Sequence, residues 1–251
     1  MKNLLATFYF SLSSLFAFSQ APFLHQGAYN GFSYEYGYQS LSKIQIKNAP
    51  YDIDWNRWSM LEDGSVYRLY FMPKGKSDKL YQFGFNPSTN SYEYGYQSTP
   101  IISIVGLPSY LEVTSFSMLH DGNDYRLYIL DKKNSKKLLQ CAYDSNFGAN
   151  GAYRYGFRSM DEISITDAPY DTDWNRWSML HDGKVYRLYF MPLNRRDVVY
   201  QFGFNGNAYE YGYKSSPKID VIGFPSSIGN DKFNMLHDGS YFRIYQLQKP
   251  K

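Results

Sequence analysis

The stretch Met179-Leu-His-Asp-Gly-Lys-Val-Tyr-Arg-Leu-Tyr189 decides the fold, because close copies of it recur three more times along the chain. Met-Leu-His-Asp-Gly also starts at Met118 and Met235, and Met-Leu-Glu-Asp-Gly starts at Met60. Asp-Gly between two apolar runs predicts a tight hairpin, because glycine accepts a positive φ without a Cβ clash. The sequence therefore predicts one antiparallel hairpin that occurs four times.

A second motif recurs in step with the first. Tyr-Glu-Tyr-Gly-Tyr starts at Tyr34, Tyr92 and Tyr209, and Tyr-Arg-Tyr-Gly-Phe starts at Tyr153. From the first Tyr to the Asp of Asp-Gly the spacing is 29 positions in all four copies, whereas from that Asp to the next Tyr it is 29, 32 and 27. The constant segment predicts a packed unit, and the variable segment predicts surface loops.

The repeats predict an all-β protein of four tandem antiparallel units that form one compact domain. Aromatic residues make up 20% of the chain, which favours strands. Four small sheets favour closed radial packing, as in a four-bladed β-propeller. The first alternative is two similar β domains of two repeats each, because residues 49–72 and 168–191 differ at only three of 24 positions. A barrel or a sandwich also fits the repeats. The predicted units cover residues 22–73, 79–131, 137–192 and 198–247.

The first residues resemble an export signal. Lys2 supplies a positive charge, an apolar run covers residues 4–18, and Ala17 and Ser19 are small residues at the positions that a signal peptidase reads. The run is shorter than the roughly 18–20 apolar residues of a membrane span. We therefore expect residues 1–19 to be a cleaved signal peptide, and the mature chain to be extracellular or periplasmic without membrane insertion.

Composition narrows the choice of partner. The net charge of +3 does not support binding of nucleic acid through bulk charge. Cys141 is the only cysteine, so no internal disulfide can form, and its apolar surroundings predict a small buried residue in a strand. No motif predicts a cofactor.

Residues that recur in all four copies are expected to serve the fold. For the Arg of each Tyr-Arg-Leu-Tyr copy or its variant we expect an ion pair or contacts to backbone carbonyls; the alternative is a ring that attracts anions along a channel. The His before Asp-Gly in three copies, with Glu in the fourth, could ligate a metal. A polar residue is expected before a turn, however, and no spacing such as His-x-x-x-His is present. No metal site is therefore predicted. The four Arg are Arg68, Arg126, Arg187 and Arg243, and the turn residues are Glu62, His120, His181 and His237.

Two matching segments, residues 51–58 and 170–177, differ from the other two copies. They contain all four tryptophans of the chain. Phe replaces Trp58 and Trp177 in the other copies, so these two rings are expected in the core, whereas Trp55 and Trp174 have no aromatic counterpart. We therefore predict two ligand-binding loops, made of Asp52, Asp54, Trp55, Asn56, Arg57, Asp171, Asp173, Trp174, Asn175 and Arg176.

The chemistry of these loops suits a sugar. An aromatic ring can stack on the apolar face of a pyranose while neighbouring polar groups bond its hydroxyls, and two equal sites raise avidity for a repetitive glycan. The alternative is a loop ordered only by its own Asp and Asn turns. A calcium loop would need a Gly where Arg57 stands. A glycosidase would use two carboxylates, but duplicated candidates favour a non-catalytic module for a glycan or surface polymer over an enzyme. The second hypothesis is a protein-interaction or structural scaffold.

Overall fold

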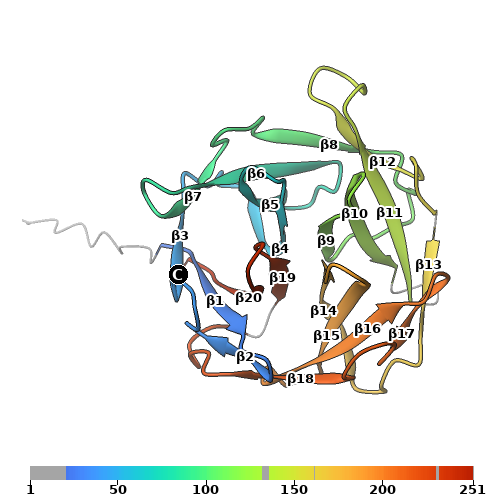
Figure 1. Ribbon diagram of the computed structural model, residues 1–251. Coiled ribbons are helices and arrows are strands. Elements are labelled where there is room, and N and C mark those ends of the chain that lie inside the picture. Colours follow the sequence, from blue (N-terminus) through green and yellow to red (C-terminus); the bar gives the residue numbers. More distant parts are fainter. Residues whose placement is uncertain (1–20, 132–135, 161, 230–231, 251) are drawn as a thin grey trace, which may run out of the picture.

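The computed structural model describes residues 21–131, 136–160, 162–229 and 232–250, which form one 20-stranded sheet without any helix (Figure 1). The all-β prediction is therefore confirmed. The expected signal peptide, residues 1–19, lies outside the described residues. Within them, no helix is long and apolar enough to cross a membrane.

Hydrogen bonding divides the described strands into four antiparallel groups of five. Group 1 contains β4 (Ile53–Glu62), β5 (Tyr67–Pro73), β6 (Lys79–Asn86), β7 (Ser91–Tyr94) and β8 (Ile101–Val105). Group 2 contains β9 (Phe116–His120), β10 (Tyr125–Asp131), β11 (Lys137–Asp144), β12 (Ala152–Tyr155) and β13 (Glu162–Thr166). Group 3 contains β14 (Thr172–His181), β15 (Tyr186–Pro192), β16 (Val198–Phe204), β17 (Ala208–Tyr211) and β18 (Lys218–Ile222). Group 4 contains β19 (Phe233–His237), β20 (Phe242–Gln248), β1 (Phe23–Tyr29), β2 (Ser33–Tyr36) and β3 (Lys43–Lys47).

Each group has the same internal order. The predicted hairpin supplies the first two strands, a third strand pairs with the second, and two short strands share the outer edge; in group 1, β6 pairs with β8 through Lys79–Tyr81 and with β7 through Phe83–Asn86. The groups are offset from the sequence units, because each unit gives three strands to one group and its last two to the next. The first and last described strands meet in group 4, where β1 lies antiparallel to β20.

Parallel pairs join neighbouring groups along their outer edges. They are β3 with β7, β8 with β12, β13 with β17, and β18 with β2, so they join groups 4 and 1, 1 and 2, 2 and 3, and 3 and 4 in a closed circuit. The inner strands β4, β9, β14 and β19 face the middle of the molecule (Figure 1). Edge strands expose unpaired backbone groups, and these linkages cover the outer ones.

The inner strands are also linked to one another, by side chains that stand one position before each Met-Leu. The backbone N–H of Met118 donates to Ser59 Oγ at 2.8 Å, that of Met179 to Ser117 Oγ at 3.0 Å, that of Met235 to Ser178 Oγ at 2.8 Å and that of Met60 to Asn234 Oδ1 at 3.3 Å. All four acceptor side chains are fully buried. They close a ring of hydrogen bonds around the middle of the molecule, which we call the inner ring.

The core consists of four apolar clusters, each lying between two neighbouring groups. Trp58 and Trp177 are buried in two of them, as predicted. Cys141 is fully buried in β11, which confirms the prediction of a small buried residue in a strand, and burial raises the pKa of its thiol to about 12.

Candidate functional site

The two predicted loops lie inside strands rather than between them. In β4 the pairing with β5 passes from Ile53–Pro73 to Trp58–Phe71, so the four residues between Ile53 and Trp58 bulge out of the ladder. The same irregularity occurs in β14 between Thr172 and Trp177. Bulges re-aim side chains at sheet edges and beside binding sites. We call residues 54–57 and 173–176 the paired bulges.

The carboxylates of the paired bulges are bonded within the protein. Asp54 accepts from the backbone N–H of Asn56 at 3.0 Å and from Arg57 Nε at 2.8 Å. Asp52, just before the bulge, accepts the hydroxyl of Tyr81 at 2.9 Å. In the second copy Asp173 bonds Asn175 and Arg176, and Asp171 accepts from Tyr200, at matching distances. These bonds hold both bulges in one shape.

The arginines of the bulges reach into the protein. Arg57 is 7% exposed and donates to the carbonyls of Pro73, Lys76 and Val113. Arg176 donates to the carbonyls of Pro192 and Arg195. Five donors on a rigid fork suit this role. Both guanidinium groups therefore anchor the bulges.

The aromatic residues of the bulges remain partly accessible. Trp55 packs edge-on against Phe71 with ring centroids 5.2 Å apart, and Trp174 does so against Phe190 at 5.0 Å. Lys136 Nζ lies 4.6 Å from the centre of the Trp174 ring. Three residues before each bulge stands a tyrosine, Tyr51 or Tyr170, that is essentially fully exposed. The bulges thus present an exposed tyrosine, a half-buried tryptophan and an exposed asparagine, Asn56 or Asn175, to a ligand.

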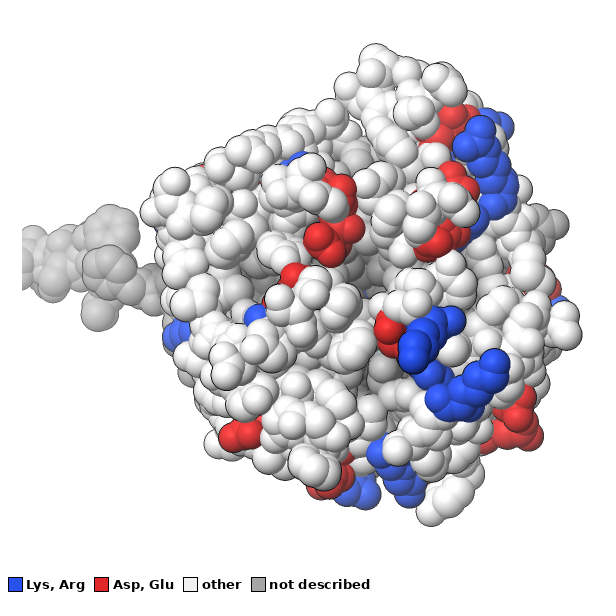
Figure 2. All heavy atoms as spheres, in the orientation of Figure 1, with Lys and Arg blue, Asp and Glu red and all other residues white. Residues whose placement is uncertain are grey.

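A central hollow is lined by the residues before the four turns. It measures about 180 Å³ and its lining includes His120, His181, His237 and Glu62. Each histidine ring lies against the aromatic residue that opens the next strand, at 4.5–4.6 Å between centroids. Although these four side chains line one hollow, the described residues contain no group of three or more His, Cys, Asp or Glu side chains that could hold a metal ion. Figure 2, drawn in the orientation of Figure 1, shows that the surface of the molecule is hollowed near its middle.

The arginines that recur in every copy bind carbonyls, as expected. Arg68 donates from Nε to Asp63 at 2.6 Å, and from its two Nη atoms to the carbonyls of Tyr96 and Gln97 at 2.9 and 3.0 Å. Gln97 has a φ of 47°, and its equivalents Gln39, Arg158 and Lys214 are also left-handed. A left-handed non-glycine residue is strained, so the guanidinium stabilises a tight turn after each Tyr-Gly-Tyr or Tyr-Gly-Phe segment.

Wider hollows, which the sequence did not predict, lie between neighbouring groups. One of about 470 Å³ separates groups 1 and 2, one of about 450 Å³ separates groups 2 and 3, and one of about 240 Å³ separates groups 4 and 1. We call them cleft 1/2, cleft 2/3 and cleft 4/1. The same positions of successive repeats line all three, which is the sequence signal that could have revealed them.

The chain matches no protein-family model, and no curated protein is significantly similar to it. Its function is therefore inferred from its own residues.

Proposed function

We propose that this protein is a secreted four-bladed β-propeller that binds carbohydrate, or a surface polymer built of it, without catalysing a reaction. Four observations support the propeller: the common order of the strand groups, the parallel pairs that link the four groups in a circuit, the inner ring, and the clusters between groups. Closure by β1 and β20 fits the radial arrangement in which neighbouring blades protect one another's edges.

The observation that carries the binding proposal is the duplication of one rigid aromatic bulge. Both copies keep the Asp–Arg pair at 2.8 Å and a half-buried Trp that follows an exposed Tyr by four residues. A surface already ordered by its own bonds loses little conformational entropy when it binds. Two such surfaces on one molecule suit a ligand with repeating units.

A glycan-array screen of the purified protein, with and without calcium, tests the proposal. We expect binding by the unaltered protein and its loss in a Trp55→Ala/Trp174→Ala double variant. Because each Trp packs on a Phe, the melting temperature of the variant is measured as well. A Tyr51→Ser/Tyr170→Ser variant is the matched control for folding, since both tyrosines are exposed. We expect this variant to retain the melting temperature and to bind more weakly.

The second candidate is a protein-interaction scaffold. Tyr51 and Tyr170 favour it, because exposed tyrosines supply large contact areas at low entropic cost and are enriched where proteins meet. A folded protein that binds no glycan on the array contradicts the carbohydrate proposal and leaves the scaffold as the better account.

A further inference from the structure

We propose that cleft 1/2 and cleft 2/3 are a second pair of binding sites, independent of the paired bulges, and that each takes one uncharged sugar residue. The two clefts measure about 470 and 450 Å³. Small-molecule sites typically measure about 300–1,000 Å³, a range that excludes the 240 Å³ of cleft 4/1.

Amides that face the clefts and bond nothing in the protein are the first reason. Gln82 lines cleft 1/2 at 7% exposure, and Gln140 lines cleft 2/3 at 5%. Neither side-chain amide has a hydrogen-bond partner within the part of the chain that the structure describes, and neither is among the polar atoms fully removed from solvent, so both amides open into their clefts. An amide that faces a cleft and bonds nothing in the protein can both donate to and accept from a ligand there.

Buried hydroxyls without a hydrogen-bond partner are the second reason, and one lines each of the two clefts. Ser98 Oγ in cleft 1/2 and Ser159 Oγ in cleft 2/3 are buried without a partner among the described residues. Each serine directly follows the left-handed residue that Arg68 or Arg126 holds. The arginine therefore fixes the position of a hydroxyl that bonds nothing in the protein.

The aromatic walls supply the third reason. In cleft 1/2, Tyr70 and Tyr153 are buried, whereas Tyr125 and Tyr143 are half-buried. Tyr125 is fixed by donation of its hydroxyl to the Asp63 carbonyl at 2.9 Å, and Tyr143 by donation to the Asn150 carbonyl at 2.8 Å. Rings held in place beside an amide and a hydroxyl, each of which both donates and accepts, match a sugar ring and its hydroxyls.

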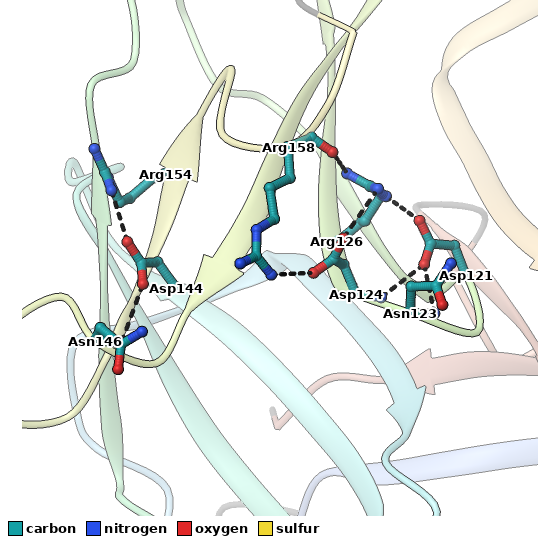
Figure 3. A network of polar contacts seen from close by, with 8 residues as sticks. All are labelled: Asp121, Asn123, Asp124, Arg126, Asp144, Asn146, Arg154 and Arg158. Atoms are coloured by element: carbon teal, nitrogen blue, oxygen red, sulfur yellow. Dashed lines mark hydrogen bonds and ion pairs between the residues drawn. The ribbon is translucent and has the colours of Figure 1, made fainter.

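The charges of the clefts select an uncharged ligand. Asp63 is the only carboxylate among the described residues that line cleft 1/2, and it is paired with Arg68 at 2.6 Å. In cleft 2/3, Asp121 pairs with Arg126, and Arg158 lies 3.7 Å from Asp124 (Figure 3). These pairs leave no uncompensated charge for an anion or a cation. The pKa of Asp63 is lowered, because its hydrogen bonds outweigh burial, so it does not suit the general acid of a glycosidase.

Cleft 4/1 provides an internal comparison. There the amide of Gln26 faces Arg243, with 3.1 and 3.0 Å from its oxygen to Nη1 and Nε in the orientation that satisfies both groups. The Ser40 hydroxyl also contacts the Gln26 carbonyl, at 3.5 Å. The polar groups of this smaller cleft are thus bonded within the protein, and it is not included in the proposal.

The test is a Gln82→Met/Gln140→Met double variant, which keeps side-chain length and removes both amides. Calorimetric titration uses glucose-, mannose-, galactose- and N-acetylglucosamine-containing oligosaccharides, with their sulfated forms as charged probes. We expect at least about tenfold weaker binding of the neutral probe, since a hydrogen bond to each sugar is lost. We expect the melting temperature to stay about the same, because neither amide bonds another described residue.

Unchanged affinity, a fall of several degrees in melting temperature, or no binding of any neutral probe would each overturn the proposal. Gln26→Met is the matched control, expected to lower the melting temperature and leave binding unchanged. A crystal of the unaltered protein soaked with the best probe gives a second readout. Sugar beside Gln82 and Gln140 supports the clefts, whereas sugar only beside Trp55 and Trp174 overturns them and supports the paired bulges.

Discussion

At the scale of the residue, a single Cβ decides how the recurrent arginine is bound. Gly84 and Gly203 stand opposite Arg68 and Arg187, and in both cases the guanidinium donates to two carbonyls. The equivalent positions opposite Arg126 and Arg243 are Ala142 and Ala28, and in these copies one such carbonyl contact is recorded. A Cβ on Gly84 would lie 2.4 Å from the Tyr96 carbonyl oxygen and 2.9 Å from Arg68 Nη1. The missing Cβ of Gly84 therefore leaves room for the Tyr96 carbonyl that accepts from Arg68.

We expect Gly84→Ala to lower the free energy of unfolding by about 1–3 kcal/mol, the usual cost of overpacking. The added Cβ must displace a backbone carbonyl rather than a flexible side chain. Urea unfolding measures the change. Ala142→Gly is the matched control and should cost only about 0.5–1 kcal/mol, the conformational cost of glycine in a strand. Equal effects of the two substitutions would contradict the explanation.

At the scale of the element, side-chain hydrogen bonds join the inner strands along the edge where they have no neighbouring strand to pair with. Ser59 accepts from the Met118 N–H and also from Asn234 Nδ2 at 3.0 Å, so one hydroxyl joins three inner strands. Such bonds satisfy buried donors that would otherwise be orphaned. They also fix the distance between neighbouring groups, and with it the width of the clefts.

Ser59→Ala should destabilise the protein by about 1–3 kcal/mol, because two buried donors lose their acceptor. The comparison is Ser65→Ala in an exposed turn, expected within about 0.5 kcal/mol of the unaltered protein. Thermal and urea unfolding of both variants provide the measurement. A stability of Ser59→Ala equal to that of Ser65→Ala would show that the inner ring does not contribute.

At the scale of the whole molecule, four equivalent ion pairs couple stability to pH. Burial alone would raise the pKa of Asp63, Asp121, Asp182 and Asp238, but backbone N–H groups and the neighbouring arginine outweigh it and lower the pKa below 3.8. A carboxyl with a lowered folded-state pKa stabilises the protein above its unfolded pKa. That contribution is lost as the pH falls through the folded value.

We therefore expect the melting temperature to be level near neutral pH and to fall steeply below about pH 4. Calorimetry across pH 2 to 7 measures this dependence. An Asp182→Asn variant should melt lower at pH 7 and show a shallower fall in acid, because one of the four titrating groups is removed. A melting temperature of the unaltered protein that does not change with pH would exclude these carboxylates as its cause.

The sequence by itself determined the local structure, because local structure depends on spacings that a chain displays directly. The Asp-Gly turns, the alternating Tyr-Arg-Leu-Tyr runs and the apolar setting of Cys141 predicted the hairpins and a buried thiol, and the structure contains them. The segments around Trp55 and Trp174 were expected to be loops, but the structure makes them bulges. Their shape depends on Arg57 and Arg176, whose carbonyl partners lie at least 16 residues away.

Only the tertiary structure decided which recurrent residues serve the fold and which remain available. Recurrence in all four copies suggested a structural role, and for Arg68 the contacts agree. Gln82 and its equivalents recur just as regularly, yet Gln82 and Gln140 have no partner within the described residues, whereas Gln26 faces an arginine. A pattern in one chain records which residue is kept but not what surrounds it. The surroundings of a cleft come from two groups of strands at once, and only packing brings those groups together.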